Sequence, residues 1–135
     1  MNFTLQKSIL VVEDETIIGL SAQSKLRRFG YDVPETASTG EEAVELALKT
    51  KPDLVLMDIQ LSGEIDGIEA AEKILKTLDV PIIYITAHAD EMTMQRAKRT
   101  LPYCYMIKPY TESELHANIE MALYKHMSEQ KDRKK

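Results

Sequence analysis

Short apolar runs alternate along this chain with segments of helical periodicity. Five runs have the length of a β-strand and are rich in aliphatic, β-branched or aromatic residues: 9–12, 31–33, 54–57, 82–85 and 103–107. The first, third and fourth are almost continuously apolar, which is typical of parallel strands that are covered on both faces. We therefore predict that these three runs form the centre of a sheet.

The segments between and after these runs carry apolar residues at the spacing of one helix face. Gly30 supplies a C-terminal stop for the first helix, Thr39 and Glu42 form a capping box for the second, and Pro81 follows the third. The fourth segment, 90–100, is the most polar. The apolar stripes of the other four are Ile18, Ala22, Leu26 and Phe29; Ala43, Val44, Ala47 and Leu48; Ile68, Ala71, Leu75 and Leu78; and Leu115, Ile119, Ala122 and Leu123.

Strand and helix thus alternate five times. This alternation predicts an α/β fold in which right-handed crossovers build an open, doubly wound parallel sheet of five strands flanked by five helices. In such sheets a ligand binds in the crevice outside the carboxyl ends of the central strands. The residues that follow the predicted strands are therefore the first candidates for a functional site.

Charged and hydroxyl side chains occupy these strand ends. Glu13 and Asp14 follow the first strand, Asp58 the third, Thr86 the fourth and Lys108 the fifth. Carboxylates that share one site repel each other unless their pKa values rise or a cation binds. Magnesium suits a site with one or two carboxylates, a backbone carbonyl and a phosphate oxygen. A lysine and a hydroxyl beside such a site can neutralise a transferring phosphoryl group.

Composition narrows the possibilities further. A chain of 135 residues has room for one domain, and 44% hydrophobic with 29% charged residues is ordinary for a globular protein. We see no signal peptide and no apolar run long enough to span a membrane, and with a single cysteine, Cys104, we expect a cytoplasmic protein. The net charge of −5 argues against direct nucleic-acid binding.

These strand-end residues closely resemble those of the receiver domains of two-component response regulators, including single-domain members of the chemotaxis-regulator type. In that family an acidic pair ends the first strand, a phosphoacceptor aspartate the third and a Ser or Thr the fourth, and Lys-Pro follows the fifth. Glu13-Asp14, Asp58, Thr86 and Lys108-Pro109 match in order and approximate spacing. The resemblance implies a flavodoxin-like strand order, 2-1-3-4-5, and covers roughly residues 8–127. We expect 128–135 to be a helical extension or tail.

The resemblance also implies a role for each residue. Asp58 would take a phosphoryl group from a phosphohistidine, and Lys108 would pair with a phosphoryl oxygen. Asp14 and Asp58 would bind Mg²⁺ (or Mn²⁺) directly, Glu13 through water, and Gln60 through its backbone carbonyl. Thr86 would move toward the phosphoryl group and let Tyr105 rotate, and the Lys108-Pro109 bond is often cis in the family. These roles imply a phosphoacceptor rather than an enzyme.

One loop departs from the family pattern. Ser62 stands four residues after Asp58, where the family has proline, and Gly67 stands nine residues after it, where the family has a glycine at eight. We therefore expect the loop 60–67 to be longer by one residue, with added flexibility at Gly63. It is the part of the site where we expect the structure to differ.

Partners and rival functions follow from the same resemblance. We expect a histidine kinase or histidine phosphotransfer protein upstream, and a downstream protein on the face of the fourth helix, fifth strand and fifth helix. The chain could also be a receiver cut from a hybrid kinase or multi-domain regulator. A phosphatase of the haloacid dehalogenase type is a weaker alternative, because its nucleophile would follow the first strand in an Asp-x-Asp pattern that Glu13-Asp14-Glu15 lacks. A non-phosphorylated scaffold would usually lack one of the acidic residues or Lys108, and none is missing here.

Overall fold

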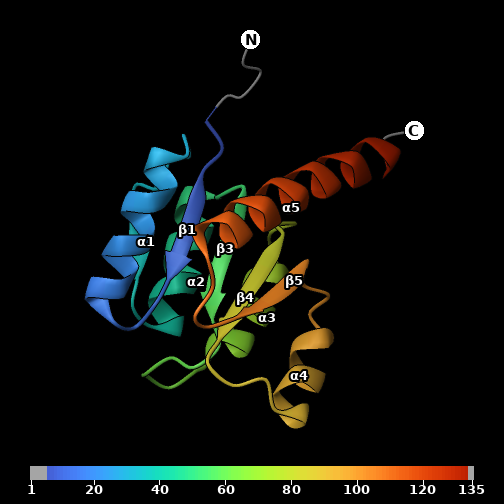
Figure 1. Ribbon diagram of the computed structural model, residues 1–135. Helices are drawn as coiled ribbons and strands as arrows, with labels where there is room; N and C mark the ends of the chain where they lie inside the picture. The colour runs from blue at the N-terminus through green and yellow to red at the C-terminus, as the bar shows by residue number, and fades with distance from the viewer. Residues whose placement is uncertain (1–5, 134–135) are drawn as a thin grey trace.

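The computed structural model describes residues 6–133 and contains the predicted parallel sheet. Its five strands lie in the order β2-β1-β3-β4-β5, which confirms the expected topology (Figure 1). The strands are β1 (Ile9–Val12), β2 (Thr36–Ala37), β3 (Leu54–Asp58), β4 (Ile82–Thr86) and β5 (Cys104–Ile107). Every residue of β1, β3 and β4 is buried, as their continuous apolar sequences predicted.

Helices cover both faces of the sheet (Figure 1). They are α1 (Thr16–Arg28), α2 (Gly40–Thr50), α3 (Gly67–Leu75), α4 (Glu91–Lys98) and α5 (Glu112–Arg133). One core cluster joins the sheet to α1 and α5, and the other joins it to α2, α3 and α4. Because side chains alternate across a strand, Tyr84 and Ile85 of β4 belong to different clusters.

The predicted second strand was placed wrongly. Residues 31–33 form only an isolated bridge, between Asp32 and Ser8, and the strand itself is Thr36–Ala37. The apolar pattern of Tyr31 and Val33 reflects their burial against α1 and α5 rather than pairing in the sheet. Pro34 interrupts the pairing, since proline has no backbone N–H to donate to a sheet.

Two details at the helix ends differ from the prediction, although Thr39 is the N-cap of α2 as expected. Thr39 caps α2 by accepting the N–H of Glu42, but the Glu42 carboxylate returns to the N–H of Ser38 rather than to that of Thr39. The third helix ends at Leu75, so Leu78 lies beyond it, although Leu78 still packs against the core. Both errors are shifts of a few residues at element ends, where hydrogen bonds rather than apolar spacing decide the boundary.

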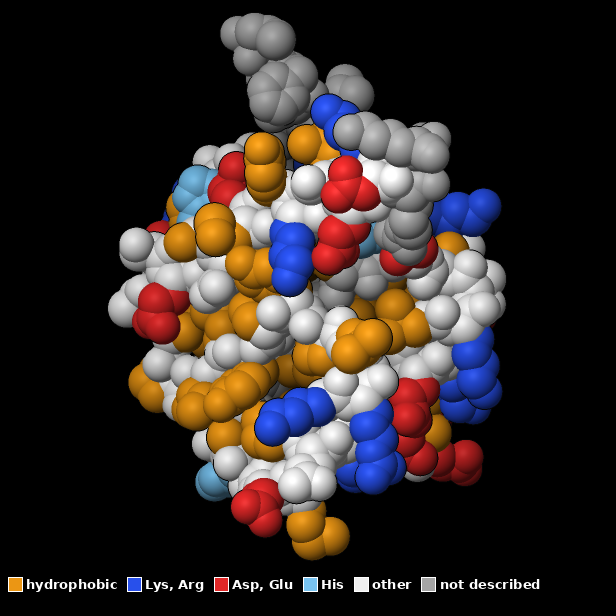
Figure 2. Space-filling view, turned by 90° about the vertical axis from the view of Figure 1, so that its right-hand side faces the viewer, with side chains coloured by type: hydrophobic (Ala, Val, Ile, Leu, Met, Phe, Trp, Pro, Cys, Tyr) orange, Lys and Arg blue, Asp and Glu red, His pale blue; other side chains and the backbone are white. Residues whose placement is uncertain are grey.

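The face that carries α4, β5 and α5 exposes several large apolar side chains (Figure 2). Tyr105 and Ile107 are two residues apart on β5, so they point to the same face of the sheet, and each is about half exposed. Figure 2 shows hydrophobic side chains gathered across the middle of this face, between basic and acidic ones. The exposed large apolar residues of α4, β5, α5 and the loop between α4 and β5 are Met92, Leu101, Tyr105, Ile107, Met121, Tyr124 and Met127.

The ends of the chain bear on three of the expectations. The first five residues, which entered the search for a signal peptide, lie outside the described residues, as do Lys134 and Lys135 of the tail. Residues 128–133 belong to α5. Among residues 6–133, no helix combines the length and apolar character that crossing a membrane requires.

Candidate functional site

The carboxyl ends of the strands carry the predicted site residues to one edge of the sheet. Asp58 is the last residue of β3 and Thr86 the last of β4, and both are buried. Glu13 and Asp14 follow β1, and the N–H of Glu13 extends the pairing by donating to the carbonyl of Ala37 at 2.9 Å. Lys108 follows β5, where its N–H donates to the carbonyl of Thr86 at 2.9 Å. These backbone bonds fix where each side chain begins.

Lys108 joins two of the three carboxylates. Its Nζ donates to Asp58 Oδ2 at 2.8 Å and to Glu13 Oε1 at 3.0 Å. The other Asp58 oxygen, Oδ1, accepts the backbone N–H of Gln60 at 3.0 Å. Lys108 precedes Pro109 through a cis peptide bond, as the resemblance implied. The ammonium therefore sits between the third strand and the first, although it comes from the fifth.

Burial dominates the electrostatics of this site. It raises the pKa of Asp58 to about 6, with a further rise from the charge of Glu13, while the hydrogen bond and charge of Lys108 act to lower it. Burial acts to lower the pKa of Lys108, but the bonds and charges of Asp58 and Glu13 outweigh burial and raise it. One ammonium thus compensates the buried carboxylates only in part.

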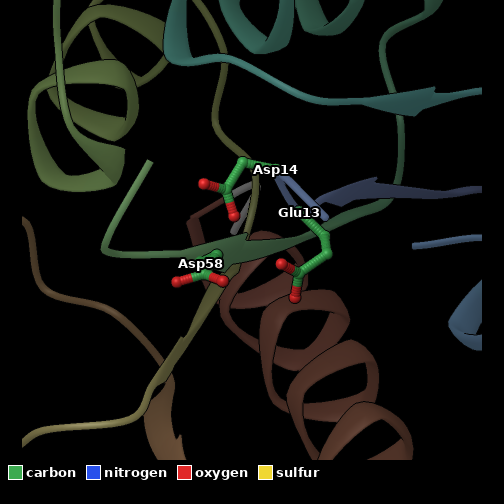
Figure 3. A group of neighbouring side chains, drawn as sticks. All are labelled: Glu13, Asp14 and Asp58. Carbon is green, nitrogen blue, oxygen red and sulfur yellow. The ribbon is translucent and has the colours of Figure 1, made fainter. Parts of the chain in front are cut away.

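The three carboxylates form a group that a cation could bridge. Glu13, Asp14 and Asp58 each offer an oxygen, and these oxygens lie within 4.8 Å of one another. Figure 3 shows the three side chains around one space at the strand ends. Three oxygen ligands of negative charge suit a hard divalent cation, and Mg²⁺ in particular binds few carboxylates and keeps some of its waters. The donor set therefore fits the magnesium that the sequence predicted.

Thr86 and Tyr105 lie on adjacent strands but do not pair directly. In the register of β4 and β5, Tyr105 is opposite Tyr84, and Thr86 is opposite Ile107. The Thr86 hydroxyl is fully buried and bonded to neighbours, whereas Tyr105 is 49% exposed. The rotation of Tyr105 and the metal contact of the Gln60 carbonyl stay predictions.

The loop after Asp58 makes several contacts with the segment that begins α2. Gly63 has a φ of 103°, which suits glycine, and Ser62 bridges to Thr39 in front of α2. The N–H of Glu64 donates to Glu41 Oε2 at 3.1 Å. The loop is thus fastened to the start of α2.

Gly67 brings α3 against the backbone of Asp58. A Cβ at this position would lie 2.0 Å from the Asp58 carbonyl oxygen, so a side chain cannot fit. The Gly67 N–H donates to the carbonyl of Ile59 at 2.9 Å. The loop is longer than in the family pattern, yet the helix still starts directly over the end of β3.

Two contacts near the site escaped the sequence reasoning. Asp66 caps α3 in a reciprocal capping box with Glu69, a spacing that the sequence does display. Asp66 also pairs with Arg96 of α4 through two bonds, at 2.9 and 3.2 Å. No sequence signal pointed to the second contact, because it joins residues from two different helices.

Comparison with known proteins agrees with this fold. The family model for the response regulator receiver domain matches residues 9–120. The transcriptional regulatory protein PdtaR of Mycobacterium tuberculosis is 38% identical over 117 residues, covering 87% of this chain and 57% of that protein. The phyllosphere-induced regulator PhyR of Methylorubrum extorquens is 35% identical over 117 residues, covering 86% of this chain and 43% of that protein. The chain therefore spans about half the length of these relatives.

Solved structures show the same similarity. The signal receiver domain of a modulated diguanylate cyclase from Desulfovibrio desulfuricans G20 superposes with a TM-score of 0.86 at 40% identity, over 92% of this chain and 98% of that one. The BeF3-activated receiver domain of RstA from Klebsiella pneumoniae gives a TM-score of 0.78 at 28% identity, over 86% and 97%.

The chain belongs to the response regulator receiver domain family of two-component systems. This is a family of signalling domains rather than of catalytic enzymes, which removes the basis for the phosphatase alternative. The structure agrees, because the first strand is followed by Glu13 and Asp14, and the buried aspartate in contact with lysine ends the third. Both relatives are named as regulators, and the match covers only 57% and 43% of their lengths.

Proposed function

We propose that Asp58 accepts a phosphoryl group from a phosphohistidine of a histidine kinase or phosphotransfer protein. The observation that carries this proposal is a buried aspartate at the end of the third strand, with Lys108 Nζ 2.8 Å from one oxygen and two further carboxylates beside it. One Asp58 oxygen would form a bond to phosphorus while the P–N bond breaks and its electron pair stays on the imidazole. With a pKa of about 6, the carboxylate is mostly ionised at neutral pH and available to attack.

The neighbouring residues would position and stabilise the transferring group. Lys108 already contacts Asp58 and would pair with one oxygen of the phosphoryl group. The Thr86 hydroxyl would donate a hydrogen bond to another of its oxygens. Glu13, Asp14, Asp58 and the backbone carbonyl of Gln60 would hold Mg²⁺, or Mn²⁺ in its place. When bound, the cation neutralises negative charge on the phosphoryl oxygens. The domain would catalyse at most its own phosphorylation on Asp58 and the hydrolysis of the resulting acyl phosphate, and we propose no other catalytic activity.

The output would be a change of shape on the α4-β5-α5 face. Its exposed apolar residues and its position next to Thr86 make it the proposed site for a downstream protein. Direct nucleic-acid binding is not part of the proposal, since the net charge is −5. We likewise propose a cytoplasmic location, where a kinase would supply the phosphoryl group.

The extent of the domain is also a proposal. We assign 1–127 to the receiver and 128–135 to a helical extension or tail. We propose a stand-alone regulator, with a receiver within a hybrid kinase or multi-domain regulator as the alternative, and the full gene sequence distinguishes these forms.

Incubation with acetyl phosphate and Mg²⁺, followed by intact mass measurement, tests the proposal. We expect one added phosphoryl group, removed by hydroxylamine as an acyl phosphate should be, and none in Asp58→Ala. Asp53→Ala, which changes an aspartate at the opposite end of β3, is the matched control and should be modified like the wild type. An adduct of equal yield in Asp58→Ala would contradict the assignment.

A further inference from the structure

The side chain of Gln60 contacts the hydroxyl of Thr86, which is proposed to bind the phosphoryl group. Its backbone N–H donates to Asp58 Oδ1 at 3.0 Å, and its side-chain Oε1 accepts from Thr86 Oγ1, also at 3.0 Å. One loop residue therefore touches both the aspartate and the buried hydroxyl at the end of β4. Gln60 itself is exposed, so filling the core does not explain its side chain.

The hydroxyl of Thr86 has more partners than it has protons. Besides Gln60, it lies 2.7 Å from the carbonyl of His88 and 3.1 Å from the N–H of His88, which it accepts. A hydroxyl donates one proton, so Gln60 Oε1 and the His88 carbonyl share it in a three-centre bond, and both acceptors hold the hydroxyl in place. If the amide group is turned so that its NH₂ faces Thr86, it donates to the hydroxyl instead, and the contact is kept.

We propose that the side chain of Gln60 is a positioning residue that holds the Thr86 hydroxyl in its resting place and so sets how readily the domain switches. This inference rests on the proposed function, in which Thr86 donates to a phosphoryl oxygen on Asp58. To do so, the hydroxyl must leave the partners that hold it in the resting structure. Each lost bond opposes the movement, so a side chain without an amide at position 60 makes the movement easier.

Gln60 is the part of this restraint that the sequence can tune. The two His88 contacts use backbone atoms, which any residue other than proline would supply at position 88. The Gln60 contact uses a side-chain oxygen, and only a side chain of suitable length and polarity can reach Thr86. A net contribution typical of a neutral hydrogen bond corresponds to a change of about fivefold in the resting equilibrium.

Gln60→Met tests the inference, because methionine keeps the length of the side chain and removes the amide. Ser62→Ala, an exposed position in the same loop, is the matched control. In the unphosphorylated protein, amide hydrogen exchange at His88 reports on the Thr86 hydroxyl, which accepts that N–H. We expect exchange about fivefold faster in Gln60→Met and unchanged in Ser62→Ala.

The second readout is the switch itself, followed by NMR of the Thr86 amide during titration with beryllofluoride and Mg²⁺. We expect half-saturation at a concentration about fivefold lower in Gln60→Met than in wild type and Ser62→Ala. Equal His88 exchange in Gln60→Met and wild type overturns the inference, and so does an equal or higher half-saturation concentration. If the wild type itself does not respond to beryllofluoride, the proposed function fails, and the inference that rests on it fails as well.

Discussion

Two neighbouring helices on the same face of the sheet, α3 and α4, are held in different ways. In α3, five of nine residues are buried, and the helix starts with a reciprocal capping box directly over the end of β3. In α4, one of eight residues is buried, and polar contacts supply much of the attachment. Arg96 pairs with Asp66, and Thr100, just after the helix, bonds the hydroxyl of Tyr84 at 2.7 Å. Of the two helices, α3 is therefore packed firmly, whereas α4 can be moved by a small free energy.

Truncation of the two helices should separate them most clearly. Ile74 of α3 is fully buried, so Ile74→Ala should lower the free energy of unfolding by about 3 kcal/mol through lost burial and a cavity. Met92 of α4 is 80% exposed, and Met92→Ala should change it by less than about 0.5 kcal/mol. Urea unfolding measures both. Similar losses for the two variants would show that the helices are held alike.

The charge of Asp58 is the next test, because α3 begins against the backbone of this residue. Its pKa is about 6 in the fold and 3.8 as an ordinary aspartate, so the fold binds this proton more tightly than the unfolded chain does. The associated stability is present at low pH and is lost as pH rises from about 4 through 6. The stability of Asp58→Asn relative to wild type should therefore increase by roughly 2 kcal/mol between pH 4 and pH 7 in metal-free buffer.

Urea unfolding at several pH values checks this, with Asp53→Asn as the control at the other end of the strand. Added Mg²⁺ should reduce the difference at pH 7, because the cation stabilises the ionised carboxylates of the wild type. A difference that is constant with pH would show that the buried carboxylate does not oppose folding.

The smallest effect concerns the ion pair between α3 and α4. The Asp66 and Arg96 side chains are 30% and 43% exposed, so their pairing should contribute only about 0.5 kcal/mol. Asp66→Asn keeps an oxygen for the helix cap, and Arg96→Gln removes the charge. A double-mutant cycle on the amide exchange of Ala97 should show this coupling, located in α4. Arg28→Gln, which breaks a more exposed pair with Glu112 at 3.4 Å, should leave α4 unchanged. Zero coupling would show that this ion pair does not help to hold α4.

Local patterns predicted most of the fold and failed where contacts between elements decide the outcome. Continuous apolar runs predicted β1, β3 and β4. Because parallel strands share one carboxyl edge, the strand ends then predicted that one edge of the sheet carries Glu13, Asp14, Asp58, Thr86 and Lys108. The second strand was misplaced because Tyr31 and Val33 are buried by packing against helices rather than by sheet pairing. The bond of Gln60 to Thr86 depends on how the loop folds over β4, which spacing along the chain does not reveal.

The position of the phosphoryl group on the chain shows whether Asp58 is the phosphoacceptor. After incubation with acetyl phosphate and Mg²⁺, reduction with borohydride converts an aspartyl phosphate to homoserine, which peptide mass spectrometry can locate. We expect homoserine at position 58 only, and only when both the donor and the cation are present. Homoserine at Asp14 or another carboxylate, or none at position 58 in a chain that has gained a phosphoryl group, would contradict it.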